Sequence, residues 1–491
     1  MIKFRELKEL SPSKAKHCLE WFCYLFAAAS LLLAPCIVVA EHPHTEGAFL
    51  VTPVVSPATY LIRFPDEILH VWPSPLKPSG PGRVNENGEL LRVVRDHLPP
   101  SFRLGGGTGG RITKTSWDGK EVWSYTMATP TLLIHHDALQ LPNGNVLALV
   151  WQRHSPEEAT AKGRDPNKVG KAGIWSDSIW ELQPLQPRGA HVVWEWNAWD
   201  HIQTVFSSDE TRDTQSQNPD EYIDIKGGWD KRPAWAGVTR MEYSDSLDQV
   251  LLVAKGFGAI WIIDHGTTTT EAASGTGGKA GKGGRLLYQW SGSPPDHDAQ
   301  ATSFIIDAEW SKGIGSKDAS IEVLRGTCRN GSVSYTVEEW QLPRLTGGSG
   351  YLLTTAGRYE SPSLLNSRPL TMPELSHHEL SRPTALSNGV VTFGAAGVIR
   401  SLNPAGMSLM EYKNGKGVTS TRISKTPVDP SLCCGGSQTG KEDSFSVPTQ
   451  ETFELKTAPV MKSRRVNLQK SLLNHEKLQL DTTGKTLQPI Q

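Results

Sequence analysis

Cysteine is scarce in this 491-residue sequence, and neither sign of charge dominates it. Of the 6 cysteines, Cys18, Cys23 and Cys36 lie in the first 40 residues. Those that remain cannot form a framework of several disulfides, and no CxxC pair indicates a zinc site. Because 50 Lys and Arg balance 51 Asp and Glu, a general electrostatic attraction to nucleic acid or to an anionic membrane is excluded.

Long segments with the 3.6-residue apolar period of an amphipathic helix are also missing after residue 40. Short apolar runs alternate with turns instead, and the chain contains 46 Gly, 33 Pro and 16 Trp. Turn residues in this abundance, with tryptophans on the apolar runs, are typical of antiparallel sheets. The composition therefore predicts an all-β fold.

The first 40 residues form a segment of their own. Basic residues precede an uncharged run at 21–40, and the run ends in small residues directly before Glu41. This order is typical of an export signal with its cleavage site, although the run is also long enough to remain in a bilayer as an anchor. Residues 1–40 are therefore predicted to be a signal peptide or a membrane anchor. The protein is expected to be exported, periplasmic or secreted, and membrane-attached if the run is retained.

Residues 46–412 repeat a pattern of turn, strand, turn and strand ending on Trp or Tyr. The units are 59–72, 87–94 with 109–125, 141–196, 241–290, 304–343 and 383–412. One four-stranded sheet cannot bury both apolar faces, whereas about six sheets packed around an axis leave only short edges exposed. The pattern predicts a six-bladed β-propeller, and a two-sheet sandwich or two smaller β-domains also fit it. Residues 415–491 have few aromatics and many polar residues, which predicts a disordered, low-complexity tail.

Three motifs suggest a ligand but lack its requirements. The glycine-rich string at 275–284 does not have the spacing of a phosphate-binding loop, because Lys282 is followed by glycine. The strings "DHD" at 296–298 and "HHEL" at 377–380 have no further spaced ligands to complete a metal site. We therefore expect neither a metal nor a cofactor.

Several strings between residues 50 and 412 resemble the arylsulfotransferase family, the exported, PAPS-independent bacterial kind. They include "NENGELLR", "HHDALQLPNGNVL", "EEATAKGRDP", "VVWEWNAWDHI", "IWIIDHGTTTTEAA" and "GKGGRLLYQW". The resemblance implies a six-bladed β-propeller. It also implies ping-pong chemistry, in which a neutral histidine attacks the sulfur of an aryl sulfate and a phenol then takes the sulfuryl group from the sulfo-histidine.

His135 and His136 match the first histidine motif of that family and are the candidate catalytic residues. Adjacent side chains on a regular strand point to opposite faces, so one of the two is expected to face the propeller axis. The sulfuryl oxygens need cationic or hydrogen-bonding groups around them. By the resemblance, the candidates for binding the substrate are Lys255, Arg329, Trp235, Asp307 and Trp310.

Three positions where the family has histidine carry other residues, namely Gly237, Ile306 and Asn197. An isoleucine cannot accept a sulfuryl group, and glycine has no side chain that could donate a hydrogen bond. The retained framework with lost imidazoles predicts a scaffold whose chemistry was changed or dropped. Histidines from elsewhere that would refill the site are His265, His297, His377 and His378.

The sequence thus predicts an arylsulfotransferase-like protein that is catalytically degenerate, and it leaves open whether the chain is an enzyme. The alternative is a non-catalytic propeller that binds a phenolic or sulfated ligand or a protein partner. A structural envelope protein is a third reading if residues 21–40 stay in a membrane. The expected partner is an aromatic sulfate or phenol and not a nucleic acid, and the oligomeric state is not predicted.

Overall fold

The computed structural model describes residues 48–413 except for 53–55, 64–66, 104, 203–217, 293–300, 312–318, 330–331, 346–347, 349, 371–383, 386–390, 396–397 and 403–407. The predicted signal or anchor and the predicted tail both lie outside the described residues. In the described ranges, no helix has the length and apolar character needed to span a bilayer.

Antiparallel strands make up the described fold, which confirms the all-β prediction. The first sheet has three strands, β1 (Ala48–Val51), β2 (Thr59–Arg63) and β3 (Glu67–Trp72). The second consists of β4 (Pro78–Val84), β5 (Leu90–Arg95), β6 (Gly110–Thr115) and β7 (Glu121–Thr126). The third consists of β8 (Leu132–Gln140), β9 (Val146–His154), β10 (Ile174–Pro184) and β11 (Ala190–Asn197).

Three more four-stranded sheets follow along the chain. The fourth sheet consists of β12 (Val238–Ser244), β13 (Gln249–Ala254), β14 (Ala259–Asp264) and β15 (Tyr288–Trp290). The fifth consists of β16 (Ala301–Trp310), β17 (Ser320–Arg329), β18 (Ser332–Gln341) and β19 (Ser363–Leu370). The sixth consists of β20 (Thr384–Ala385), β21 (Val391–Ala395), β22 (Val398–Leu402) and β23 (Ser408–Lys413).

Helices are short and lie in the connections between strands. The described ones are η1 (Pro100–Phe102), α2 (Pro156–Ala161), η2 (Pro166–Lys168), η3 (Ala198–His201), η4 (Pro219–Glu221) and α3 (Thr269–Ala272). Both α-helices begin with a capping box, in which Ser155 and Thr268 each cap the helix and a glutamate three residues later bonds back. None of them covers a sheet face, so the sheets must bury their apolar faces against one another.

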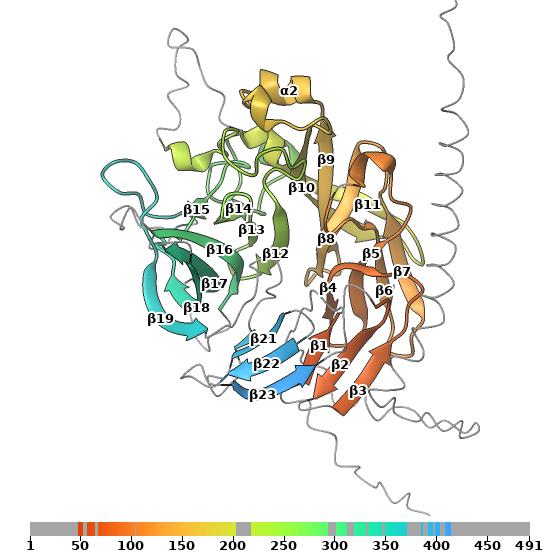
Figure 1. Cartoon of the computed structure of the whole chain (residues 1–491). Coiled ribbons are helices and arrows are strands. Elements are labelled where there is room, and N and C mark those ends of the chain that lie inside the picture. Colours follow the sequence, from red (N-terminus) through yellow and green to blue (C-terminus); the bar gives the residue numbers. More distant parts are fainter. Residues whose placement is uncertain are drawn as a thin grey trace, which may run out of the picture.

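The sheets are arranged around a common centre, as Figure 1 shows. Within each sheet the strands follow one another in chain order, so that the first strand is the innermost. Successive first strands are in contact, β1 with β4, β4 with β8, β8 with β12 and β12 with β16. This radial arrangement is a β-propeller, and it replaces the sandwich and the two-domain alternatives.

The prediction of six blades is wrong, because the described residues form five four-stranded blades and a three-stranded sheet, β1–β3. The Pro- and Gly-rich segment after Trp72 is one reason for the error, since its composition indicates a turn. It forms β4, the innermost strand of the next blade. Proline is tolerated there because an edge strand leaves some N–H groups outside the ladder.

Tryptophans fill the spaces between neighbouring sheets. Fully buried indoles belong to Trp72, Trp123, Trp151, Trp175, Trp196, Trp235 and Trp261. One continuous core joins the blade of β8–β11 to the blade of β12–β15, with Trp196 and Trp261 among its members. Burial of a large apolar side chain contributes roughly 1.5–3 kcal/mol, so these indoles carry much of the stability of the ring.

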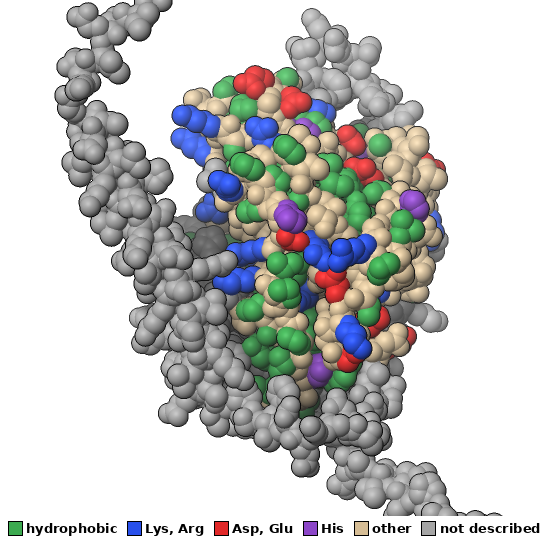
Figure 2. Space-filling model, turned by 90° about the vertical axis from the view of Figure 1, so that its right-hand side faces the viewer, with side chains coloured by type: hydrophobic (Ala, Val, Ile, Leu, Met, Phe, Trp, Pro, Cys, Tyr) green, Lys and Arg blue, Asp and Glu red, His purple; other side chains and the backbone are tan. Residues whose placement is uncertain are grey.

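Charges of both signs alternate on the surface. On the face that Figure 2 shows, Lys and Arg side chains lie beside Asp and Glu side chains, with hydrophobic side chains scattered among them. No broad field of one sign covers this face, as the balanced composition leads one to expect.

Candidate functional site

A large bulge in β8 forms the starting point of the site. Ile134 pairs with Val150 and Ala138 with Ala148, so that three residues of β8 oppose a single residue of β9. His136 lies in this bulge with φ 45°, a left-handed conformation that side-chain-bearing residues seldom adopt. Bulges of this kind redirect side chains and are frequent beside active sites.

The bulge turns His135 and His136 toward each other. Their Nδ1 atoms are 2.9 Å apart and share one hydrogen bond, and the ring planes are perpendicular, at 90°. The expectation that the two side chains point to opposite faces is therefore wrong, because it assumed a regular strand. His135 is completely buried, whereas His136 is partly accessible.

The glycine-rich loop at 105–110 holds the bulge in place. The N–H of His136 donates to the carbonyl oxygen of Gly107 at 2.9 Å, and Thr108 forms a β-bridge with His135. Gly107 has φ 69°, and a Cβ built on it would lie 2.1 Å from Nε2 of His136. A side chain at position 107 would therefore displace the imidazole.

Asp177, on β10, completes a buried row behind His135. Its Oδ1 lies 3.3 Å from Nε2 of His135 and accepts a hydrogen bond from the Trp151 indole at 3.1 Å. Its Oδ2 receives the N–H of Val238 at 3.5 Å. The ring of His135 stacks on Trp151 with centroids 4.1 Å apart. Sequence reasoning missed Asp177, which is hidden in the Trp-rich string at 173–182.

Burial sets the protonation of these groups. It lowers the pKa of His135 well below the usual value, with the neighbouring His136 adding to the effect. Burial, then the positive charge of Lys255, and to a smaller extent that of Arg95, lower the pKa of His136 to about 3, although Asp137 opposes them. Both imidazoles are therefore neutral near pH 7, which is the form that can act as a nucleophile.

Asp177 responds to burial in the opposite direction. Burial raises the pKa of its carboxyl to about 8, against the hydrogen bonds from Val238 and Trp151. A buried carboxyl without a cation is more stable when protonated, because the charged form loses its hydration. Asp177 and His135 together therefore avoid a net charge in the core.

Two cations act on His136 electrostatically, and one of them was predicted. Lys255 lies in the turn after β13, where its N–H donates to the carbonyl oxygen of Gly237 at 3.1 Å. Burial lowers the pKa of its ammonium, with Asp307 opposing and Arg240 assisting. The second cation is Arg95, at the exposed end of β5. Arg95 could have been found from its position in the repeated unit. It is the last residue of β5, the second strand of its blade, and Lys255 directly follows β13, the second strand of another blade.

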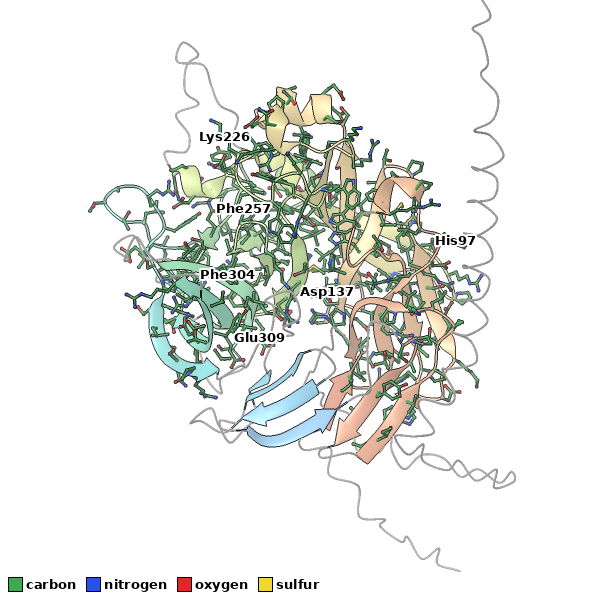
Figure 3. All side chains as sticks on the ribbon, in the orientation of Figure 1. His97, Asp137, Lys226, Phe257, Phe304 and Glu309 are labelled. Carbon is green, nitrogen blue, oxygen red and sulfur yellow. The ribbon has the colours of Figure 1, made fainter. Side chains whose placement is uncertain are left out.

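Arginine and acidic side chains link the innermost strands of four consecutive blades, β4, β8, β12 and β16. Arg83 of β4 binds both carboxylate oxygens of Asp137 at 3.2 and 2.8 Å, and it contacts Glu242 of β12 at 3.1 Å. Arg240 of β12 bonds to Glu242 and lies 3.1 Å from Asp307 of β16. Figure 3 shows Asp137 near the middle of the ring, with Glu309 of β16 across from it. This network fixes the inner strands relative to one another.

Residues 83–275 match the family model of arylsulfotransferase (ASST). Over this range the chain is similar to the arylsulfotransferase family, which confirms the resemblance found in the sequence. The matched range includes His135, His136, Asp177 and Lys255, whereas Asp307 and Ile306 lie beyond it. No curated protein matches the chain.

Solved structures with similarity to the chain share little sequence with it. A Bacteroides caccae protein of unknown function is 12% identical, with 77% of this chain and 98% of the other covered and a TM-score of 0.39. The periplasmic gluconolactonase PpgL of Pseudomonas aeruginosa is 12% identical, with 77% of this chain and 98% of the other covered and a TM-score of 0.40. The Cps50 (Swd1) β-propeller domain of Myceliophteria thermophila is 10% identical, with 77% of this chain and 86% of the other covered and a TM-score of 0.36. At these scores the likenesses carry no argument about function.

The arylsulfotransferase positions without histidine have different fates. Ile306 is buried at a bulge in β16, between the pairs formed by Ile305 and Asp307. At Gly237, with φ 61°, an added Cβ would lie 2.5 Å from the ring of Trp229, which fills the space of a side chain. Asn197 caps η3 by accepting the N–H of Trp199 at 3.0 Å. Asn197 therefore serves the local fold.

The other predicted substrate-binding residues lie in diverse surroundings. Asp307 is engaged by Arg240, and the buried indole of Trp235 donates to the carbonyl oxygen of Gly227 at 2.6 Å. Trp310 lies at the far end of β16, packed partly against the core. Arg329 is exposed at the end of β17. The described geometry thus gathers His135, His136 and Lys255 from the predicted set, and it adds Asp177 and Arg95.

His265 does not refill the arylsulfotransferase site. Its Nε2 lies 3.0 Å from Glu181 and its Nδ1 lies 2.8 Å from Asp248, so that it joins two blades. Burial alone would lower its pKa, but the two carboxylates raise it above the usual value. The other histidines considered for this role, His297, His377 and His378, lie outside the described residues.

Proposed function

We propose that the chain is a sulfuryl-transfer enzyme of the arylsulfotransferase family and that His136 is its sulfuryl acceptor. The observation that carries the proposal is a partly accessible, neutral imidazole, hydrogen-bonded to His135 and approached by Lys255 and Arg95. The similarity of residues 83–275 to the family supports the reaction class. The proposed activity therefore depends on the histidines of β8. The corresponding bulge of β16 carries Ile306, which has no imidazole.

In the proposed reaction, Nε2 of His136 attacks the sulfur of an aryl sulfate. The bond between sulfur and the aryl oxygen breaks, and the phenoxide leaves and takes a proton from solvent. A second phenol then attacks the sulfur, loses its proton and departs as the new aryl sulfate, which restores the imidazole. Lys255 and Arg95 would stabilise the charge on the sulfuryl oxygens, a contribution that commonly amounts to several kcal/mol in group transfer.

The first test uses 4-nitrophenyl sulfate as donor and phenol as acceptor. We expect release of 4-nitrophenol and an acid-labile mass gain of one sulfuryl group on the peptide that contains His136. His136→Asn keeps an atom near Nδ1 for the contact with His135 but removes Nε2. The rate should therefore fall about a thousandfold or more.

His97→Asn is the matched control for this test. His97 also has a positive φ, 48°, and it lies at the outer edge of the ring in Figure 3, with 80% of its side chain exposed. This variant should retain full activity. Transfer that continues unchanged in His136→Asn would disprove the proposal.

A non-catalytic propeller that binds an aryl sulfate is the second candidate. It is favoured by two positions that offer no imidazole, Gly237 directly before β12 and Ile306 in the bulge of β16. Under this alternative, 4-nitrophenyl sulfate raises the melting temperature of the protein without any release of 4-nitrophenol. Lys255→Ala should then abolish the thermal shift, since the cation that holds the sulfate is removed.

A further inference from the structure

Three side chains form one row that ends at the proposed sulfuryl acceptor. Asp177 comes from β10, and His135 and His136 come from the bulge of β8. The contacts are 3.3 Å from Asp177 Oδ1 to His135 Nε2 and 2.9 Å from His135 Nδ1 to His136 Nδ1. The side chain of Asp177 is 1% exposed and that of His135 is 0% exposed. Water therefore does not supply the protons inside this row.

Asp177 Oδ1 and His135 Nε2 are in contact at 3.3 Å without hydrogen-bond geometry, whereas the two Nδ1 atoms share a hydrogen bond. Two bare acceptor atoms at this distance repel each other, so one of them carries a proton, and its place sets the direction of the next link. A neutral imidazole carries a hydrogen on only one of its two nitrogens. If Asp177 is ionised, Nε2 of His135 donates to it, and Nδ1 of His135 must accept from Nδ1 of His136. Nε2 of His136 is then left unprotonated. If Asp177 is protonated, every donor reverses and Nε2 of His136 carries the hydrogen.

We propose that Asp177 and His135 are positioning residues that determine whether Nε2 of His136 is free to attack. Ionisation of Asp177 removes one proton from the row, and the proton leaves at the far end, from Nε2 of His136. The inference rests on the proposed function for the use of that nitrogen. The arrangement of protons itself can be measured without any turnover.

The surroundings of both ends bear on the pH at which this occurs. Asp177 faces His135 and receives hydrogen bonds from Trp151 and from the N–H of Val238. These donors favour the carboxylate, while burial opposes it and raises the pKa of Asp177 to about 8.

At the other end of the row, charged groups surround His136. Lys255 and Arg95 disfavour a positive charge on the imidazole, and Asp137 favours it. Neither His135 nor His136 is a histidinium at neutral pH. The change in the row is therefore one between two neutral forms of His136, governed by the carboxyl of Asp177.

The experiment records long-range ¹H–¹⁵N spectra of the full chain labelled with ¹⁵N-histidine between pH 5 and 10. His136→Asn identifies the resonances of His136. In the wild type, Nε2 of His136 should change from protonated to unprotonated with a midpoint near the pKa of Asp177, about 8. Asp177→Asn should abolish the change, because an amide does not ionise. A wild-type Nε2 that is constant over this range would overturn the inference.

Asp248→Asn provides the matched control. Asp248 also contacts a largely buried histidine, His265, at 2.8 Å, but it lies outside the row. This variant should show the wild-type transition of His136. A folded Asp177→Asn protein with an unchanged transition would overturn the inference, with folding judged by circular dichroism.

Trp151→Phe tests the same row if Asp177→Asn fails to fold. It keeps a ring under His135 but removes the hydrogen bond to Asp177, which costs the carboxylate a donor. The midpoint should rise by about one pH unit or more. An unshifted midpoint would contradict the inference. Sulfuryl transfer with a constant His136 Nε2 would overturn the inference alone, whereas a normal transition without transfer would overturn only the proposed function.

Discussion

The inner strands of two blades share Asp-Ala at corresponding positions but differ in the two residues before it. β8 reads His-His-Asp-Ala at 135–138, and β16 reads Ile-Ile-Asp-Ala at 305–308. Both strands have a bulge here, and in both the aspartate pairs with an arginine of the preceding inner strand, Arg83 or Arg240. The aspartate and the bulge therefore belong to the scaffold, and under the proposed function the residue pair before the aspartate decides the chemistry.

The bulges differ in size, and the difference bears on function. In β8 three residues oppose one, whereas in β16 only Ile306 is extra. The larger bulge gives His136 its positive φ and turns two imidazoles together. Two isoleucines in the smaller bulge are buried in the core. The blades of β8 and β16 thus retain similar support, while of these two strands β8 carries the imidazoles at the bulge.

The largest expected effect comes from removing the two aspartates in turn. Asp137→Ala removes a completely buried carboxylate, which leaves Arg83 with Glu242 and takes the acceptor from the N–H of Met241. Breaking a buried pair typically costs about 3–5 kcal/mol. Asp307→Ala should cost about 1 kcal/mol, because Asp307 is partly exposed and Arg240 keeps Glu242 as a partner. Denaturant unfolding of both variants measures the difference. Equal losses would mean that the two aspartates support their blades equally.

A smaller effect is expected from Gly107→Ala, which tests whether the imidazole pair requires a residue without a side chain at position 107. The methyl group would lie 2.1 Å from Nε2 of His136 and would force a positive φ on alanine. We expect a loss of about 1–3 kcal/mol in stability, together with reduced sulfuryl transfer. Gly144→Ala, with φ 87° and open space around it, should lose stability but retain transfer. Similar activities in both variants would contradict the importance of this contact.

The last comparison concerns acid stability. The double variant His135→Ile, His136→Ile gives β8 the residues of β16. In the wild type, folding depresses both histidine pKa values, that of His136 to about 3. Their contribution is therefore present above about pH 6.5 and is lost as the pH falls toward 3. The variant should lose less stability between pH 7.5 and 4.5, as measured by urea unfolding. An unchanged pH slope would indicate that other groups dominate.

Local patterns in the sequence predicted most of the strands but not their roles. The continuous apolar runs of β9 and β13 are visible in the chain, and tryptophans of the strings at 173–182 and 192–201 are buried, as sheet-forming aromatics often are. β4 was missed because its prolines indicate a turn, and only its edge position makes them acceptable. The blade count was also wrong, because it treated the first unit as a full blade, whereas β1–β3 form a three-stranded sheet.

The site was partly predictable from the sequence. The histidine pair and Lys255 were found through their resemblance to a family motif. Asp177 and Arg95 were missed, because each reaches the site from another strand and neither has a spacing that links it to the histidines.

The sequence by itself determined the antiparallel strands, the balanced charge and the histidine motif, since these depend on neighbours along the chain. Tertiary structure alone decided that β4 is an inner strand and that Asp177 stands behind His135. It also decided that the bulge turns two imidazoles onto one side. These features arise where backbone from the loop at 105–110 and side chains from several strands meet, and burial there shifts the pKa values that make His136 a candidate nucleophile.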